Sequence, residues 1–593
     1  MRFTFYVIAL LVALGLTWRY LGSYMAAVFE GRVHWMGWLE RPIYRVLGVD
    51  PEAEQSWQRY AASLIIYSGI AILLIYGIER LQGSLPLNPQ HLGAVGPALS
   101  FNTATSFVTN TNWQNYVGES TMSYLTQMVA LVGQQFFSAA AGMCVMVALI
   151  RGLARRNSST VGNFWVDLTR GVFYILLPIA AVAAVIYIGQ GAVETLAGPA
   201  CFHNVLNGVH SCIPRGPQGS MTPIKQLGNN GGGFTNANGA HPFENPTAFT
   251  QWLSLLLLLA IPTASTYMYG KMVKSFRQGL AVLATMAILF VSWAAFAQYS
   301  ESRGNPAVAA AGVTHQPSGN MEGKEVRFGV APTTLFDVAS TQTSTGSVTG
   351  SNDSFTPIGG MALLTGMMLG EVSPGGAGAG MYTILAFAII AVFIGGLMVG
   401  RTPEYLGKKI QAREVKLAAL LVLVMPMIVL IFAGIAVSVH EGRAGPLNGG
   451  PHGFSEILYA ITSPANNNGS AFAGLTANTP FYNVLQSLAM YFGRFAEMIP
   501  AVALGGYLGQ KNVSPAGAGT FRTDTPVFVG LFVGVILIVG ALTFFPAVAL
   551  GPIVEQLIHH KFFGKPSVIA PALQTTHHLV NGAFVFAQRM FSS

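Results

Sequence analysis

Four short polar segments of the sequence have the composition expected of a site for a monovalent cation. They end in runs of Asn, Thr, Ser and Gly, contain neither Lys nor Arg, and span residues 106–114, 227–238, 343–349 and 462–472. Glycine tolerates positive φ, so consecutive carbonyl groups can turn toward one axis, where they can replace the hydration shell of an ion. The four segments also lack carboxylates, which favours an alkali cation over a divalent one.

The spacing of these segments indicates an internal repeat. Thr111, Gly232, Gly346 and Gly469 mark their centres and lie 121, 114 and 123 residues apart. One such segment alone would be interpreted as a surface turn, because Asn, Gly and Ser dominate turns. Four at nearly one period instead predict four repeats, each made of a helix, a re-entrant loop and a helix.

Half-helices are expected to lead into the loops. The semi-polar stretches Pro97–Val108 and 454–461 precede the first and fourth segments. A helix that ends at the loop would point its negative dipole end at the site and so favour a cation. Irregular backbone at membrane depth is tolerated only where it is buried or lines a water-filled cavity.

The composition places these elements in a membrane protein. Only 9% of the 593 residues are charged, against about 25% in a soluble domain. Hydrophobic residues make up 52% of the chain and its mean hydropathy is +0.50. These values exclude a disordered chain, a disulfide scaffold and a soluble multidomain enzyme. They predict an all-α polytopic membrane protein with about ten transmembrane helices and four helix–pore loop–helix repeats.

Ten apolar runs are long enough to cross a hydrocarbon core of about 30 Å. They are residues 3–29, 60–78, 122–150, 172–189, 249–269, 279–299, 381–400, 417–439, 481–508 and 527–557. The expected units are a first span with its connection (1–59), four repeats with one polar segment each (60–160, 161–278, 279–412 and 413–511), a last span (512–560) and a tail of unassigned role (561–593).

Basic residues cluster in alternate connections, at 151–156, 271–277, 401–416 and 511–522. The positive-inside rule predicts that these connections face the cytoplasm and that the polar segments face the opposite side. The net charge of +8 is therefore a topology signal. It forms no contiguous basic stripe, so membrane lipid and not nucleic acid is the expected surrounding. Gly152, in the first of these connections, is expected to tolerate substitution.

Charged residues inside the spans have two interpretations each. Arg494 is a functional candidate because a charge at that depth is costly, or it is a structural partner of Glu497. Glu371 could attract a cation from within, or it could pair with a basic residue.

Four other features of the sequence give narrower expectations. Cys201 and Cys212 flank an outward connection and are expected to form a disulfide, with two free thiols as the alternative. The glycines at 376–380 favour helix packing over dinucleotide binding. Residues 319–324 lack the spacing of a phosphate loop, so no nucleotide is expected on this chain. The paired histidines are expected to belong to an exposed tail: His559, His560, His577 and His578.

Long runs of the sequence closely resemble the A subunit of the bacterial Kdp potassium-transporting ATPases. The most specific are the Gly-Gly-Gly-Phe-Thr-Asn-Ala-Asn run with its His-Pro-Phe-Glu-Asn-Pro continuation at 231–247 and the Ala-Asn-Asn-Asn-Gly-Ser run at 465–474. Residues 101–114, 319–328 and 400–409 also match, and the resemblance extends to about Leu557. It excludes residues 306–316 and the tail.

The resemblance implies a fold like that of the potassium transporter superfamily and a role in potassium import. It implies that this chain takes up external K⁺ and passes it to the P-type pump of the complex, the B subunit, which hydrolyses ATP. The C and F subunits then complete the complex. The resemblance further implies a bacterial inner membrane location, with the filter loops facing the periplasm and no catalytic site on this chain.

The resemblance also assigns the filter positions residue by residue. They are Thr109, Asn110, Thr111 and Asn112; Asn230, Gly231, Gly232 and Gly233; Ser344, Thr345, Gly346 and Ser347; and Asn467, Asn468 and Gly469. The chain departs from the family pattern at Thr345, where Cys is expected, and at Thr235, where Phe is expected.

The residues alone leave a second function open. A self-sufficient potassium channel or an ion-gradient symporter of the same fold would need the same four loops. An intramembrane enzyme is disfavoured, because no nucleophile can be placed beside a base. A P-type ATPase that co-purifies with the chain would separate the first two interpretations.

Overall fold

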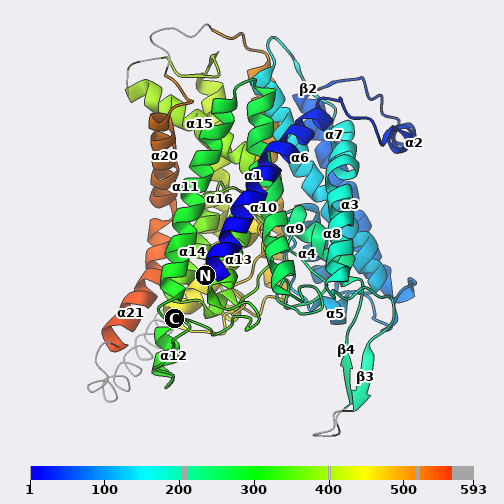
Figure 1. The fold of residues 1–593 in the computed structure, drawn as a ribbon, viewed down its shortest axis with the longest axis vertical. Coiled ribbons are helices and arrows are strands. Elements are labelled where there is room, and N and C mark those ends of the chain that lie inside the picture. The colour runs from blue at the N-terminus through cyan, green and yellow to red at the C-terminus, as the bar shows by residue number, and fades with distance from the viewer. Residues whose placement is uncertain are drawn as a thin grey trace.

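The computed structural model describes residues 2–203, 208, 210–398, 400, 402–514 and 521–563. The remaining residues, including the tail 564–593 with His577 and His578, lie outside the described part, as do the side chains of His559 and His560. Within the described part, nine helices are long and apolar enough to cross a membrane. They run roughly along the vertical axis of Figure 1. The predicted all-α polytopic membrane fold is therefore confirmed.

The spans correspond to the predicted apolar runs. Their helices are α1 (Arg2–Phe29), α3 (Trp57–Leu81), α6 (Gly133–Ala154), α7 (Phe164–Arg170), α8 (Leu177–Gly189), α10 (Ala248–Met272), α11 (Phe276–Glu301), α15 (Ala379–Met398), α16 (Ala412–Ser438), α20 (Pro526–Val548) and α21 (Val554–Phe563). Turns of π-helix extend three of them, at Thr126–Val132, Gly171–Leu176 and Ala549–Ile553.

The predicted span 481–508 is a helix of a different character. This helix, α19 (Pro480–Gly509), has 30 residues and so a length of about 45 Å, but it is not among the nine apolar spans. Asn483, Gln486 and Arg494 lie along it and are buried inside the protein. Its polar groups therefore face other helices and not lipid, which is where polar residues in membrane helices are found.

Small residues let the central helices approach closely. An added Cβ on Gly152 in α6 would lie 2.0 Å from the carbonyl oxygen of Gly505 in α19. An added Cβ on Gly22 in α1 would lie 2.5 Å from the carbonyl oxygen of Ala264 in α10. The expectation that Gly152 tolerates substitution is therefore wrong, because this glycine is a packing contact and not a surface residue.

Four short helices end inside the protein at the polar segments. They are α4 (Pro97–Val108), α9 (Gln218–Leu227), α13 (Val330–Gln342) and α18 (Gly450–Ala465). The first has the predicted bounds, and the last extends the predicted stretch 454–461 at both ends.

The third repeat contains a helix that the apolar runs of the sequence did not predict. The helix α14 (Pro357–Met368) is apolar but too short to span, and a turn at residues 369–378 joins it to α15. Gly370, Glu371, Gly375 and Gly378 all have positive φ in this turn. An added Cβ on Gly378 would lie 2.2 Å from the carbonyl oxygen of Gly142 in α6, so the glycines allow the turn to pack against that helix.

The remaining elements are short and lie in the connections. They are α2 (Gly37–Leu47), α5 (Gly118–Thr121), α12 (Pro306–Ala310), α17 (His440–Arg443), the 3₁₀ turns Gln82–Ser84 and Asn352–Ser354, and three antiparallel pairs: β1 (Gln55–Ser56) with β2 (Thr160–Gly162), β3 (Ala200–His203) with β4 (His210–Ile213), and β5 (Glu404–Tyr405) with β6 (Lys408–Lys409). The predicted Cys201–Cys212 disulfide is present and joins β3 to β4.

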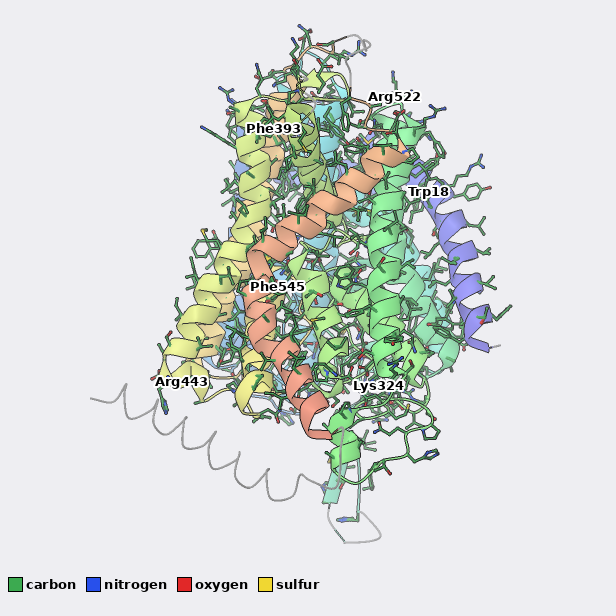
Figure 2. The ribbon with its side chains drawn as sticks, turned by 90° about the vertical axis from the view of Figure 1, so that its left-hand side faces the viewer. Trp18, Lys324, Phe393, Arg443, Arg522 and Phe545 are labelled. Atoms are coloured by element: carbon green, nitrogen blue, oxygen red, sulfur yellow. A yellow bond between two sulfur atoms is a disulfide. The ribbon has the colours of Figure 1, made fainter. Side chains whose placement is uncertain are left out.

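The basic connections gather at one end of the molecule, the upper end of Figure 1, where α2 and β2 lie. Lys408 donates from its ammonium to the carbonyl oxygens of Gly152 and Leu508, both at 2.7 Å, and so ties the C-terminal ends of α6 and α19 together. The β3–β4 hairpin and α12 lie at the lower end. Figure 2 likewise places Arg522 at the upper end, and Lys324 and Arg443 at the lower end.

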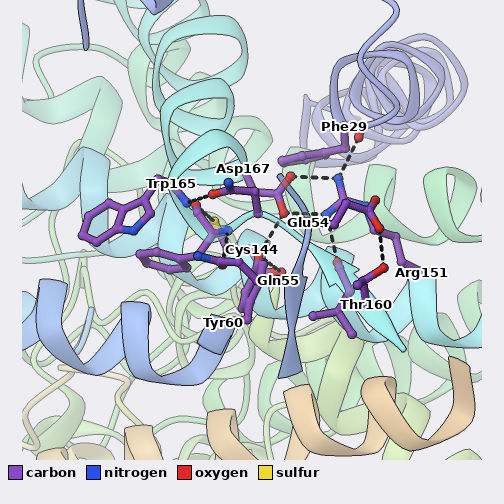
Figure 3. A network of polar contacts seen from close by, with 12 residues as sticks. Phe29, Glu54, Gln55, Tyr60, Cys144, Arg151, Thr160, Trp165 and Asp167 are labelled. Carbon is purple, nitrogen blue, oxygen red and sulfur yellow. Dashed lines mark hydrogen bonds and ion pairs between the residues drawn. The ribbon is translucent and has the colours of Figure 1, made fainter. Parts of the chain in front are cut away.

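An ion-pair network stabilises the upper end (Figure 3). Arg151 makes a bidentate contact with Asp167 at 2.5 and 2.8 Å, and the Tyr60 hydroxyl donates to the same carboxylate at 2.9 Å. Both partners are buried, so the charges depend on one another and on these hydrogen bonds. The network lies far from the polar segments, at the opposite end of α6.

Candidate ion-binding site

The four short helices end at loops with the same backbone conformation. We call these loops 1 (residues 109–112), 2 (228–233), 3 (343–347) and 4 (466–469). Each helix ends two residues before a non-glycine residue with positive φ, and a second residue with positive φ follows two positions later. The pairs are Asn110 and Asn112, Asn229 and Gly231, Ser344 and Gly346, and Asn467 and Gly469.

A shared hydrogen bond fixes the register between the loops. In each loop the residue between the two positive-φ positions donates its N–H to the carbonyl five residues earlier. The pairs are Thr111 to Ser106, Asn230 to Lys225, Thr345 to Ser340 and Asn468 to Ser463, at 2.9–3.1 Å. The sequence markers Thr111 and Gly232 therefore lie one residue before and one residue after the true equivalents, Asn112 and Gly231.

The glycines bring the loops into contact in cyclic order. An added Cβ on Gly231 of loop 2 would lie 1.6 Å from the carbonyl oxygen of Thr345 in loop 3. On Gly346 of loop 3 it would lie 2.4 Å from that of Asn468 in loop 4, and on Gly469 of loop 4 it would lie 1.9 Å from that of Thr111 in loop 1. No side chain fits at these three positions. These contacts form three of the four junctions of a ring.

Contact between loops 1 and 2 completes this ring. An added Cβ on Gly232 would lie 2.7 Å from the Cβ of Asn112. Asn112 is the one member of its set of equivalent positions that carries a side chain. Its carboxamide is buried, and neither of its polar atoms has a hydrogen-bond partner in the described structure.

Asparagine side chains join neighbouring loops laterally. Asn110 donates to the carbonyl oxygens of Gly228 and Asn229 at 3.2 and 2.9 Å, which links loop 1 to loop 2. Asn229 donates to the Thr345 hydroxyl at 3.0 Å, which links loop 2 to loop 3. The hydrogen bonds hold the loops together without placing a formal charge in the ring.

The junction between loops 3 and 4 is built differently. Ser344 occupies the position that is Asn in the other loops, and its side chain is too short to reach its neighbour. Its hydroxyl donates to the carboxylate of Glu371, which also accepts a hydrogen bond from the Asn468 carboxamide at 2.7 Å. Glu371 comes from the turn at 369–378, so this carboxylate supplies the lateral link that an Asn supplies elsewhere.

The ion pairs considered for Arg494 and Glu371 from the sequence do not form within the described part of the chain. Among the described residues, Glu371 makes no ion pair, and neither do Arg494 and Glu497. Arg494 donates to the carbonyl oxygen of Ser138 at 3.3 Å.

The last two glycines of loop 2 have their carbonyl groups occupied. Gln135 in α6 donates to the Gly232 carbonyl oxygen at 2.6 Å. The side chain of Gln114 both donates to the Gly233 carbonyl oxygen at 2.9 Å and accepts from its N–H at 3.0 Å. In this arrangement Gly232 and Gly233 brace loop 2 against α6 and against Gln114, which follows loop 1. Asn229, absent from the sequence-based set, belongs to the ring.

A cavity of about 910 Å³ lies on the lower side of the ring. Its lining includes Asn112, Gly346 and Gly469 from three loops, Asn238 after loop 2, and Lys324, which Figure 2 places at the lower end. The residues of the ring are buried, and the groups that they bring to it are backbone carbonyls and hydroxyl and carboxamide side chains. Such neutral oxygens suit the coordination of a dehydrated alkali cation.

The structure brings together most of the predicted site residues. Loops 1, 3 and 4 contribute the predicted residues 109–112, 344–347 and 467–469, and loop 2 contributes Asn230 and Gly231. Sequence reasoning missed Asn229, although an Asn two residues before a Gly is the pattern that loops 2 and 4 share. It also did not foresee Gln114 and Gln135 as braces, because Gln114 ends the first polar segment without a filter role assigned to it and Gln135 lies in no motif.

A multi-pass helical membrane protein with four half-helices and a ring of four re-entrant loops is the class that this fold and site define. The family model described as potassium-transporting ATPase A subunit matches residues 7–557. The chain therefore belongs to the potassium-transporting ATPase A subunit family, as the resemblance indicated.

Relatives from several bacteria match over nearly their whole length. Each is named potassium-transporting ATPase potassium-binding subunit. The protein from Mesorhizobium japonicum is 52% identical over 556 residues, which cover 93% of this chain and 97% of the relative. The protein from Methylococcus capsulatus is 51% identical, with 91% and 96% covered, and that from Mycobacterium tuberculosis is 53% identical, with 93% and 98% covered. Among solved structures, the potassium transporter TrkH from Vibrio parahaemolyticus matches with a TM-score of 0.48 and 14% identity, over 81% of this chain and 96% of that one.

Proposed function

We propose that this chain is the potassium-binding and translocating subunit of an ATP-driven potassium importer. The observation that carries the proposal is the closed ring, in which Gly231, Gly346 and Gly469 each lie against a carbonyl of the next loop. Its relatives, at about half identity over nearly the whole chain, are named for potassium binding.

The proposed filter comprises residues 109–112, 229–231, 344–347 and 467–469, with Gly232 and Gly233 as its support. Carbonyl and hydroxyl oxygens would replace the water around K⁺. The C-terminal ends of α4, α9, α13 and α18 would add the negative ends of four helix dipoles. The ring is rigid because every loop is tied to its neighbours, and this rigidity would favour one ion size.

Transport against a gradient would need a partner, because the chain has no recognisable phosphate-binding loop for ATP. We propose that this partner is a P-type ATPase, the B subunit of the Kdp complex, which the C and F subunits complete. The positive-inside rule then puts the upper end in the cytoplasm of a bacterial cell and the cavity at the periplasmic face of its inner membrane.

Reconstitution tests the proposal. The chain is purified from its native membrane, its companions are identified by mass spectrometry, and K⁺ uptake into liposomes is measured with ATP and no ion gradient. A P-type ATPase is expected among the companions, and concentrative uptake is expected only when it is present. Concentrative uptake by the chain alone would contradict the proposal, and uptake driven by an imposed ion gradient would favour a symporter.

A further inference from the structure

One position in the repeat breaks the symmetry of the ring. The residue whose carbonyl accepts the shared loop hydrogen bond is Ser106, Ser340 and Ser463 in three repeats, but Lys225 in the second. A basic side chain thus lies directly behind a ring that otherwise has only neutral groups and the Glu371 carboxylate.

The ammonium group of Lys225 is completely buried. It contacts the Glu244 carboxylate at 2.7 Å and donates to the Asn238 carboxamide oxygen at 2.5 Å. Both side chains of the ion pair are excluded from solvent, and Glu244 is also held by the N–H of Gly239. A buried charge of this kind is tolerated only while its partner is present.

Asn238 connects this ammonium to the ring through hydrogen bonds. With its carboxamide oxygen on Lys225, its amide nitrogen donates to the carbonyl oxygen of Gly231. Its own carbonyl oxygen accepts from the N–H of Val348, just after loop 3, at 3.0 Å. Because the ammonium can only donate, it fixes which end of the carboxamide faces Gly231.

We infer that Lys225 is a positioning residue for ion selection, which holds Asn238 on the Gly231 carbonyl while Glu244 cancels its charge. The inference rests on the proposed function and adds two requirements to it. Loss of Glu244 leaves an uncompensated cation beside the ion site and weakens K⁺ binding. Loss of the whole pair restores electroneutrality but frees Asn238, so discrimination between ions falls.

Three variants of the complete complex separate these effects, with the K⁺ and Na⁺ dependence of ATP-driven uptake as the measurement. Glu244→Gln is expected to raise the half-saturating K⁺ concentration at least about tenfold, equivalent to about 1.4 kcal/mol. Lys225→Met/Glu244→Gln is expected to return to within about threefold of the wild type, with the preference for K⁺ over Na⁺ reduced at least about fivefold.

Asp167→Asn is the matched control. It replaces a buried, paired carboxylate by an amide in the same way, but in the network of Figure 3 at the other end of α6. It is expected to lower stability and to leave the half-saturating K⁺ concentration within about twofold of the wild type.

The outcomes also distinguish the inference from the proposed function. A wild-type complex without K⁺-dependent uptake overturns the proposed function. If the wild type takes up K⁺ but Glu244→Gln has an unchanged K⁺ affinity, the role of Lys225 is overturned and the proposed function stands. The same holds if Asp167→Asn shifts the half-saturating K⁺ concentration as much as Glu244→Gln does. If Glu244→Gln does not reach the membrane, the double variant decides, and unchanged discrimination in it overturns the inference.

Discussion

The carboxamide of Asn467 donates a hydrogen bond to the hydroxyl of Thr111 at 2.9 Å, although the two residues lie 356 positions apart in the chain. The contact joins loop 4 back to loop 1, and Asn229 makes the same contact to Thr345 between loops 2 and 3. A disturbance in one loop is therefore expected to reach its neighbour, which makes the junctions the sensitive points of the ring.

Substitution of a junction glycine should damage the ring more than the fold. Gly469 has a φ of +92°, and an added Cβ would lie 1.9 Å from the Thr111 carbonyl oxygen. Gly469→Ala is therefore expected to weaken K⁺ affinity at least about tenfold, since the left-handed backbone alone costs about 1–2 kcal/mol. Gly530→Ala in α20, where nothing lies within 4 Å, is the control and should match the wild type in K⁺-dependent uptake.

Gly233→Asp is expected to act through Lys225. An added Cβ there would lie 2.6 Å from the Lys225 ammonium and 2.5 Å from the Asn238 carboxamide oxygen. The new carboxylate would compete with Glu244, so we expect weaker K⁺ affinity and poorer discrimination against Na⁺. In a Glu244→Gln background it would replace the missing charge, and the K⁺ affinity should then recover in part. Additive losses in the double variant would contradict this mechanism.

Loss of the Glu371 carboxylate should open the junction between loops 3 and 4. A buried donor left without its acceptor costs about 1–3 kcal/mol, and Glu371→Ala removes the acceptor of both Ser344 and Asn468, so it is expected to lower K⁺ affinity at least about tenfold. Ser344→Asn in the same chain supplies the side chain that the other junctions use and should restore part of the affinity. K⁺ titrations of the single and double variants measure this recovery. If the K⁺ affinity does not recover in the double variant, Glu371 does not act as the link between loops 3 and 4.

The N-terminal end of α18 should show a pH-dependent stability. Burial would lower the pKa of His452, but hydrogen bonds to Asp353 and Glu555, each at 2.8 Å, outweigh it and raise the pKa to about 10. A raised histidine pKa stabilises the fold fully below about pH 6.5, and this stabilisation is lost as the pH rises through 10.

His452→Gln tests this pH dependence. The variant is expected to unfold more readily by about 2 kcal/mol at pH 7, and the difference from the wild type should narrow toward pH 10. Thermal unfolding of the purified protein at pH 7 and pH 10 measures it, with His440→Gln at an exposed position as the control. A difference that does not change with pH would exclude protonation as its source.

The spans and two of the four half-helices, α4 and α18, could be predicted because their signals are local. Apolar length identified the spans, and the equal spacing of Asn- and Gly-rich segments identified the repeats. The register of loop 2 could not be predicted, since three consecutive glycines offer three equivalent choices until helix α9 fixes where it ends. Helix α14 was missed because twelve apolar residues are too few for a span.

Contacts between distant segments explain the other differences. Gly152 was expected to lie in an ordinary connection, and only the approach of Gly505 leaves no room for a side chain there. Similarly, nothing in the local sequence around Lys225 places its ammonium next to Asn238, thirteen residues later. Both features depend on tertiary packing, which no local pattern encodes.

The position of Lys225 has a consequence for why the ring is built from one chain. In a homotetramer every residue occurs four times, so a lysine behind the ring would bring four buried cations to one ion site. A single polypeptide can change one quarter independently, and here it combines three serines with one lysine and its own counter-charge. Four repeats within one polypeptide thus allow the ion's surroundings to be asymmetric, a freedom that identical subunits do not have.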